Sequence, residues 1–429
     1  MALIMLLVVF AILMFLGAPV AITMIGSSLV YILLEPSMNF SNVATKIVTS
    51  VTGTSLITLP LFIMAGEIMN SSGVTERLFR FPLTLIGHIR GGLAHVNVLA
   101  SMLFAGMSGA AIADTAGLGK IEMDIMEKEG YDKGFSAGIT AASSTIGPII
   151  PPSNTLVVYA VAVEVSVGRL FMGGILPGVV MGLLLMLYIA LVAKRKNLPK
   201  REKATWGERG VALCQAFFPM LTPVILLTGI CTGIMTATEA GAICVLYALI
   251  LNFIYNGFHL KQLQEILTNS FVTMAQICFI VMASGLFGWT ITLANLPNMV
   301  AEFLYTLGTQ RWMILLLINV LLLFMGCFLS INASLMIAAP ILVVLAQMYD
   351  IDLVHLGIIV TLNLTIGLLT PPVGWNLYIM SSVANISYKD MVKASLPFVV
   401  VLFIALMIIT YCEPIVTWLP NLVFGVGVS

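Results

Sequence analysis

Charge is scarce in this 429-residue chain. Only 9% of its residues are Asp, Glu, Lys or Arg, whereas roughly a quarter of the residues of a soluble protein are charged. The 19 basic and 19 acidic residues balance, so no net charge favours a nucleic acid as a partner. Sixty per cent of the residues are apolar, and many glycines and prolines lie inside the apolar runs, as membrane helices tolerate. The composition therefore predicts an all-α polytopic membrane protein.

Sequence signals of metal binding and of ATP use are also missing. The six cysteines are scattered through apolar segments without a Cys-x-x-Cys pair, which argues against a disulfide framework or a zinc site. Thiols in such surroundings are expected to be buried and inert. The chain has no P-loop motif, so pumping driven by ATP within this chain is not expected.

Long apolar segments are abundant. A helix that crosses a hydrocarbon core of about 30 Å needs roughly 20 apolar residues. Strong candidates lie at 2–34 (broken or bent near Gly17-Ala18-Pro19), 53–70, 169–193, 214–235, 239–257, 270–296 and 393–419, and weaker or interrupted ones at 81–108, 134–165, 312–328 and 354–384. Two further segments, 109–128 and 331–348, follow breaks rich in small residues. We expect them to be return arms of hairpins that enter the membrane without crossing it.

The long polar stretch 194–210 divides the chain almost in half. It holds seven of the nineteen basic residues, and the positive-inside rule assigns such a loop to the cytoplasm. Binding of anionic lipid is an alternative explanation for its charge. We therefore expect a basic cytoplasmic linker between residues 1–193 and residues 211–429.

The two halves carry related motifs at a constant offset of 220 residues. Thr145-Ile146-Gly147-x-x-x-Pro151-Pro152 aligns with Thr365-Ile366-Gly367-x-x-x-Pro371-Pro372, and Asp132 aligns with Asp352. Across 101–180 we count roughly 17 identities, where about six are expected by chance. The offset predicts two inverted-topology repeats, residues 1–193 and 211–429. The first would contain a hairpin at about 93–128 and a broken helix at about 134–165, and the second a hairpin at about 312–348 and a broken helix at about 354–384.

The proline pairs have a chemical consequence. Proline lacks an N–H, so the carbonyl four residues earlier loses its helical partner. The carbonyls released in this way are those of Ser144, Gly147, Pro148, Gly367 and Leu368. An unpaired carbonyl at membrane depth is unfavourable unless something binds it, and a dehydrated alkali cation is a suitable partner. Small polar segments at 106–110 and 326–334 would be the hairpin tips that face these breaks, which gives two similar cation sites.

Helix ends and hydroxyl groups near the tips offer a site for a carboxylate substrate, because a helix N-terminus attracts anions without a buried lysine or arginine. Asp114, just after the first tip, has two interpretations of equal weight: a functional carboxylate or a charge that stabilises the N-terminus of its helix. Candidate substrate-binding residues are Ser108, Gly109, Asp114, Ser153, Asn154, Asn332, Ser334 and Trp375.

A family resemblance rests on five stretches that are spread over the whole chain. They are Leu59 to Gly66, Gly106 to Gly119, Ser143 to Pro152, Thr236 to Ala242 and Thr365 to Pro372. In these stretches the chain resembles the large membrane subunit of tripartite ATP-independent periplasmic (TRAP) transporters, the DctM-like family. Within the family it is most similar to large subunits for sialic acid.

This resemblance implies an elevator-type, sodium-coupled importer of an organic acid, with sialic acid as the expected substrate. It implies a multi-pass protein of the bacterial inner membrane that couples transport to two or more sodium ions and has no enzymatic activity. The implied partners are a small four-helix membrane subunit, a soluble periplasmic substrate-binding protein and membrane lipid, with no nucleic acid.

The resemblance also implies two sodium sites. Carried over by motif, the first comprises Gly106, Ser108, Ser144, Thr145, Gly147 and Ile150, and the second comprises Gly326, Cys327, Ser330, Thr365, Gly367 and Thr370. The first tip departs from the family at Ala110, where many relatives have a serine. A side-chain ligand is therefore not expected from that position.

Two other classes of function compete with a transporter. Gly106-Met107-Ser108-Gly109 matches the Gly-x-Ser-Gly motif of rhomboid-type intramembrane serine proteases, in which the serine pairs with a histidine on another helix. Such a protease does not explain the duplicated Thr-Ile-Gly-x-x-x-Pro-Pro motif. A passive channel is the third class, and accumulation of a substrate against its gradient would distinguish it from a transporter.

Overall fold

The computed structural model describes residues 2–35, 40–257, 259–306 and 310–425. Within these ranges the chain forms twenty α-helices and two short 3-10 helices, and no strand. Seven helices are long and apolar enough to cross a membrane: α10 (Val167–Arg195), α11 (Trp206–Cys231), α12 (Ala237–Asn256), α13 (Leu260–Leu293), α15 (Arg311–Phe328), α16 (Ile331–Met348) and α19 (Tyr388–Tyr411). The prediction of an all-α polytopic membrane protein is confirmed.

The first half begins with shorter helices. They are α1 (Ala2–Phe15), α2 (Val20–Leu34), α3 (Phe40–Thr49), α4 (Thr58–Ser71), α5 (Val74–Ile86), α6 (Gly92–Ser108), α7 (Ala111–Lys128), α8 (Lys133–Ser143) and α9 (Asn154–Val163). Gly17 has a φ of 79° between α1 and α2, and these two short helices pack on each other, so the segment 2–34 is broken rather than bent at Gly17-Ala18-Pro19. A 3-10 turn, η1 (Thr54–Ile57), precedes α4, and η2 (Ser144–Ile146) follows α8.

Two further predicted spans are each divided between two helices in the structure. The segment 81–108 is not one helix, because α5 ends at Ile86 and Gly91 adopts a φ of 72° before α6 begins. There the Gly91 N–H donates to the carbonyl of Pro199 at 3.1 Å, so the linker completes the turn. The segment 393–419 is also divided, because α19 ends at Tyr411 and Pro414 starts a new helix, α20 (Pro414–Phe424). Proline suits this first position, where its missing N–H has no helical partner to lose.

The middle of each half has the same order of elements. Helices α6 and α7 meet at Gly109, and α8 is separated from α9 by the segment around Pro151 and Pro152. In the second half α15 and α16 meet at Leu329–Ser330, and α17 (Leu353–Gly367) is separated from α18 (Trp375–Ala384) by Pro371 and Pro372. Asp132 and Asp352 cap α8 and α17 through side-chain hydrogen bonds to backbone N–H groups.

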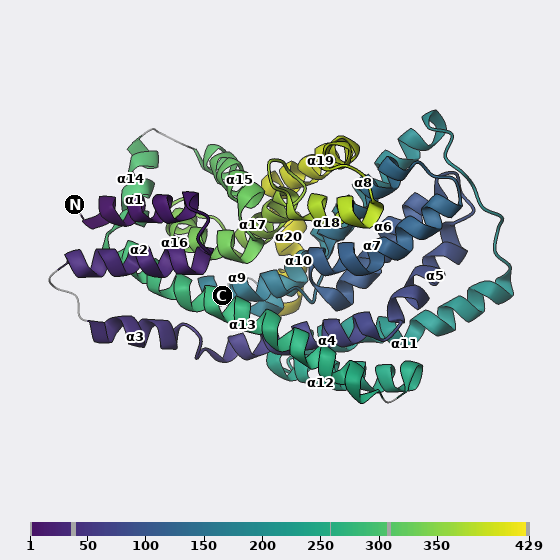
Figure 1. Cartoon of the computed structure of the whole chain (residues 1–429), viewed down its shortest axis with the longest axis horizontal. Helices are drawn as coiled ribbons and strands as arrows, with labels where there is room; N and C mark the ends of the chain where they lie inside the picture. The colour runs from purple at the N-terminus through teal and green to yellow at the C-terminus, as the bar shows by residue number, and fades with distance from the viewer. Residues whose placement is uncertain (1, 36–39, 258, 307–309, 426–429) are drawn as a thin grey trace.

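The halves pack on one another in matching pairs. Helix α7 packs on α18 while α16 packs on α9, and α8 packs on α19 while α17 packs on α10. Figure 1 shows α5, α6, α7 and α8 toward one end of the long axis, with α1, α14 (Leu296–Thr306), α15 and α16 toward the other. The return arm of each hairpin, α7 or α16, therefore contacts the broken helix of the opposite half.

Candidate functional site

The first hairpin tip lies directly on the first proline break. Gly109 has a φ of 62°, in the left-handed region that favours glycine, and it separates α6 from α7. A Cβ atom at Gly109 would lie 3.2 Å from the carbonyl carbon of Pro152 and 3.3 Å from the Asn154 nitrogen. On another side, Gly66 of α4 lies against the tip, where a Cβ would be 3.3 Å from the Ser108 carbonyl oxygen. Glycine therefore permits close backbone contact on two sides of this tip.

A buried carboxylate connects the tip to the break. The Ser108 hydroxyl donates a hydrogen bond to one carboxylate oxygen of Asp114, which is only 2% exposed. The other oxygen, Oδ2, has no hydrogen-bond partner among the described residues, and it points at Gly147, where any Cβ would overlap it. The serine thus pairs with an aspartate rather than with a histidine, which is not the dyad that the protease interpretation requires.

The Ser144 hydroxyl joins both halves of the chain. It accepts hydrogen bonds from Thr115 Oγ1 at 2.8 Å and from Asn376 Nδ2 at 3.1 Å, and it donates to the Ala141 carbonyl at 2.8 Å. Asn376 lies on α18 of the second half and is fully buried. Sequence analysis missed Asn376, although an asparagine in an apolar helix just after a proline break was an available signal.

The proline break frees fewer carbonyl oxygens than the sequence predicts. The Ser144 carbonyl accepts from the Gly147 N–H at 3.1 Å, and the Pro148 carbonyl accepts from the Ser153 hydroxyl at 2.5 Å. Ser153 also caps α9, since its Oγ accepts from the Leu156 N–H at 3.1 Å. The Gly147 carbonyl accepts no hydrogen bond from the residues that the structure describes. Of the three oxygens predicted in this half, one remains without a partner.

The second tip is built from glycine packed on glycine. A Cβ at Gly367 would lie 2.7 Å from both the Cα and the carbonyl carbon of Gly326, so α15 and α17 touch through their backbones. The Cys327 carbonyl accepts a hydrogen bond from the Gly374 N–H at 3.4 Å. Ser330 caps α16, with its Oγ accepting from the Ala333 N–H at 3.4 Å. This tip is therefore held mainly by backbone contacts.

Both carbonyls predicted to be free in the second half have partners. The Gly367 carbonyl accepts from the Thr370 N–H at 3.0 Å, and the Leu368 carbonyl accepts from the Asn376 N–H at 3.1 Å. The hydroxyls of Thr370 and Thr365 donate to carbonyls of their own segment, at 3.0 Å and 2.7 Å. The lost helical hydrogen bonds are replaced by a 3-10-like turn after α17 and by the backbone of α18. A prediction that considers only the helical partner four residues further on does not anticipate these bonds.

The remaining candidate residues fall into three groups. Thr145 donates to the Ala142 carbonyl at 2.6 Å, and Ile150 packs against Gly178, so both side chains have structural contacts. Trp375 is 46% exposed and Asn154 is partly buried. Ser334 Oγ and Asn332 Oδ1 are buried atoms without a hydrogen-bond partner in the described part of the chain. These two side chains lie in the first turn of α16, just after the second tip.

The first site contains a second buried carboxylate on the same helix. Glu122 of α7 is 1% exposed, and its Oε2 accepts from Asn97 Nδ2 at 2.6 Å. Asn97 Oδ1 in turn accepts from Ser143 Oγ at 2.8 Å, so the network joins α6, α7 and α8. No group of three His, Cys, Asp or Glu side chains that could hold a metal ion occurs among the described residues. The oxygen atoms of the site are carbonyl, hydroxyl and single carboxylate groups, which suit a hard cation.

The helical hairpins, the paired proline breaks and the apolar surface define an integral membrane transporter. Residues 7–415 match the sequence model of a family described as "Tripartite ATP-independent periplasmic transporter, DctM component", and the chain belongs to this family. Membership excludes the enzyme alternative, because the relatives are named as transporter permeases.

Individual relatives cover nearly the whole chain. The sialic acid TRAP transporter large permease protein SiaM of Vibrio cholerae is 40% identical over 416 residues, which are 97% of each protein. The sialic acid TRAP transporter permease protein SiaT of Haemophilus influenzae is 37% identical over 97% of this chain and 68% of its own length. The C4-dicarboxylate TRAP transporter large permease protein DctM of Vibrio cholerae is 36% identical over 96% of each protein.

A solved structure shares the fold. The YdaH transporter of Alcanivorax borkumensis superposes with a TM-score of 0.67, covering 94% of this chain and 98% of that one at 14% sequence identity. At this identity the match describes the arrangement of helices only.

Proposed function

We propose that this chain is the translocating subunit of a sodium-coupled importer of an organic acid, with sialic acid as its substrate, in the bacterial inner membrane. A periplasmic binding protein delivers the substrate, and a small four-helix membrane subunit completes the complex. The substrate site moves across the membrane by an elevator motion of the hairpins and broken helices. One observation carries the proposal: each hairpin tip lies against a proline break of its own half and each return arm packs on the broken helix of the other half.

The matching contacts support an inverted repeat. When each helix is replaced by its equivalent in the other half, the pair α7–α18 becomes α16–α9 and the pair α8–α19 becomes α17–α10. All four pairs are in contact. Such exchange is expected when two repeats are related by a pseudo-two-fold axis. Figure 1 shows the α6–α7 hairpin and the α15–α16 hairpin on opposite sides of the middle of the molecule, as such an axis requires.

The first site offers suitable oxygen ligands for a sodium ion. Asp114 Oδ2, which lies against the Cα side of Gly147, and the Gly147 carbonyl oxygen both lack hydrogen bonds within the described residues. A buried carboxylate without a cation is unfavourable, so binding of Na⁺ would stabilise both groups. In the second half the Gly367 and Leu368 carbonyls already accept one hydrogen bond each, so a sodium ion there would use their second lone pairs.

The substrate assignment follows the relatives. Two relatives named for sialic acid share 40% and 37% identity with the chain, and one named for C4-dicarboxylates shares 36%. All of these substrates are carboxylates, and the N-terminal turn of α16 carries the Ser334 hydroxyl, which has no partner among the described residues and can donate a hydrogen bond to such an anion. The sialic acid assignment therefore extends the family function by similarity.

The exposed apolar surface supports a membrane partner. Side chains such as Phe217 and Phe218 on α11 and Leu246 and Phe253 on α12 are exposed. Lipid and a four-helix subunit can share this surface, since both are apolar.

Uptake into proteoliposomes tests the proposal. The chain is reconstituted with its small subunit and binding protein, and accumulation of labelled N-acetylneuraminate is followed with and without an inward sodium gradient. We expect accumulation against the substrate gradient only with sodium and both partners. A matched assay with succinate separates the two substrate classes. Equilibration without accumulation would indicate a channel, and full uptake of free substrate by the chain alone would contradict the tripartite assignment.

A further inference from the structure

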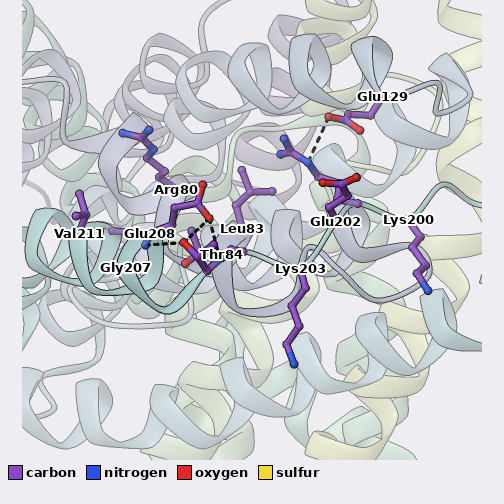
Figure 2. A pocket seen from close by; sticks show the side chains of 14 residues that line it. Arg80, Leu83, Thr84, Glu129, Lys200, Glu202, Lys203, Gly207, Glu208 and Val211 are labelled. Carbon is purple, nitrogen blue, oxygen red and sulfur yellow. Dashed lines mark hydrogen bonds and ion pairs between the residues drawn. The ribbon is translucent and has the colours of Figure 1, made fainter.

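A large cavity lies at the junction of the basic linker with α5 and α11, away from the hairpin tips. Its volume is about 1000 Å³, and its wall combines α5 residues with the linker and the first turns of α11. Figure 2 shows Arg80 and Thr84 of α5 on this wall, together with Lys200 and Lys203 of the linker. The family's transport chemistry at the hairpin tips does not use these residues.

Some charged side chains of the cavity wall have hydrogen-bond or ion-pair partners, and others have no ion-pair partner among the described residues. Glu129 forms an ion pair with Arg201 at 3.3 Å, and Glu208 Oε2 accepts from the backbone N–H of Thr205 at 2.7 Å as part of a capping box. Arg80, Lys200 and Lys203 have no ion-pair partner in the described part of the chain, and Glu202 is the remaining acidic residue of the wall. Glu208 stays anionic because its capping partners are neutral, so the four basic and three acidic side chains of the wall leave an excess of one positive charge, which attracts an anion.

An apolar groove continues from the same cavity. This second cavity, of about 560 Å³, shares Gly207 and Val211 with the first, and its wall includes Cys214 and Phe218 of α11. Tyr255 of α12 closes the groove with its ring 3.9 Å from the Arg77 guanidinium carbon. A molecule that fills both cavities needs a charged group at one end and a hydrocarbon chain at the other.

The position of the groove matches the cytoplasmic surface of a membrane. Trp206, at the first residue of α11, is 84% exposed, and exposed tryptophan is enriched at the headgroup level. The neighbouring linker is rich in lysine and arginine, as cytoplasmic loops are. Anionic lipid headgroups are concentrated in that leaflet and attract basic segments.

From the joined polar and apolar cavities we infer a binding site for one anionic glycerophospholipid. Its phosphate lies in the first cavity, where the basic side chains of the wall outnumber the acidic ones, and an acyl chain follows α11 past Val211 and Phe218. The lipid joins the linker to α5, which leads directly into the first hairpin. A free phosphate ion shares the headgroup chemistry, but it would leave the apolar groove unfilled.

Three variants separate the two parts of the site. Arg80→Gln and Lys203→Gln each remove a cation, and Lys261→Gln removes an exposed lysine of α13 as a matched control. Gly207→Leu fills the point shared by the two cavities. A Cβ at Gly207 meets nothing within 4 Å, and a leucine favours the helix, so this variant should fold. Melting temperatures in detergent check the folding of each variant.

Native mass spectrometry of the full chain, released from nanodiscs of phosphatidylglycerol or phosphatidylcholine, measures bound lipid. We expect one retained phosphatidylglycerol, little phosphatidylcholine, and a loss of affinity of about fivefold for each cation removed. Gly207→Leu should lose the lipid and Lys261→Gln should keep it. Equal retention of both lipids, retention in Gly207→Leu, or displacement by millimolar inorganic phosphate would overturn the lipid assignment. Uptake is not the readout, so failure of this site is distinguishable from failure of the proposed transport function.

Discussion

The two hairpin tips share their backbone design but not their side chains. At the 220-residue offset, Gly106, Gly147 and Pro151 of the first half correspond to Gly326, Gly367 and Pro371 of the second. The polar residues around the first tip have no such counterparts. Ser108, Thr115 and Ser144 correspond to Phe328, Leu335 and Leu364, Asp114 corresponds to Ser334, and Asn376 corresponds to Leu156.

This difference separates two requirements of the site. Close approach of a tip to a break depends on glycine, which both halves supply, because a Cβ would enter the facing backbone or the Asp114 carboxylate. Neutralising a cation depends on a carboxylate, and among these equivalent tip positions only the first half supplies it, at Asp114. We infer that the repeat duplicates the backbone geometry, whereas charge compensation for a coupling ion resides in the first half.

The largest effect is expected where glycine meets glycine. Gly367→Ala places a Cβ 2.7 Å from backbone atoms of Gly326, so α15 and α17 must separate. Overpacking of this kind costs about 1–3 kcal/mol, and we expect a lower melting temperature and loss of uptake. Gly117→Ala on α7 is the control, since a Cβ there meets nothing within 4 Å. A Gly367→Ala protein with unchanged melting temperature and uptake would show that the backbone contact is dispensable.

The second-largest effect is expected from the Asp114 carboxylate. Asp114→Asn keeps the size of the side chain and removes its charge. We expect the sodium concentration for half-maximal uptake to rise about tenfold, in keeping with the loss of one charged interaction in a buried site. Asp124→Asn, on an exposed position of the same helix, should leave this concentration unchanged. Uptake that follows a pH gradient without sodium and disappears in Asp114→Asn would instead identify a proton relay.

The proline pairs should differ in importance. Pro151→Ala restores an N–H that can bond the Gly147 carbonyl, which is otherwise unpaired within the described residues. Pro371→Ala acts on the Gly367 carbonyl, which already accepts from Thr370. We expect the sodium dependence of uptake to weaken several-fold more in Pro151→Ala than in Pro371→Ala. Only Pro151→Ala gives a new hydrogen bond to a carbonyl that otherwise lacks one, and the factor corresponds to roughly one hydrogen bond. Equal effects of the two substitutions in the same uptake assay would argue that both breaks bind ions alike.

Sequence reasoning predicts the features that depend on glycine and proline. The break at Gly17 and the separation of α17 from α18 at Pro371 follow from local backbone chemistry. Local rules fail where a distant segment completes a turn. Gly91 ends a predicted span because the Pro199 carbonyl, more than one hundred residues away, accepts its N–H. The partners of the Leu368 and Pro148 carbonyls are nearer, the Asn376 N–H and the Ser153 hydroxyl, but they are not helical partners, so the number of free oxygens could not be derived from proline spacing.

The contact between the halves also escaped prediction, because Asn376 and Ser144 are 232 residues apart. No periodicity relates an α18 amide to the end of α8. Both side chains are buried in apolar surroundings, where each one alone suggests only a satisfied polar group. The site of the first half is therefore completed by a residue that its own repeat does not contain.

The smallest effect is expected from this amide. Asn376→Leu removes the hydrogen bond to Ser144 Oγ and restores the residue type found at the equivalent position, Leu156. A neutral buried hydrogen bond contributes about 1 kcal/mol, so we expect the sodium concentration for half-maximal uptake to rise about fivefold, with the protein still folded. Asn363→Leu, which removes an amide bonded to Asn319 on α15 instead, controls for general loss of a buried amide. If the sodium dependence changes equally in both variants, or only in Asn363→Leu, the Asn376 side chain does not belong to the ion site. If it changes only in Asn376→Leu, sodium binding at the first tip depends on the second half of the chain, and the motion of the two halves must be coupled through α18.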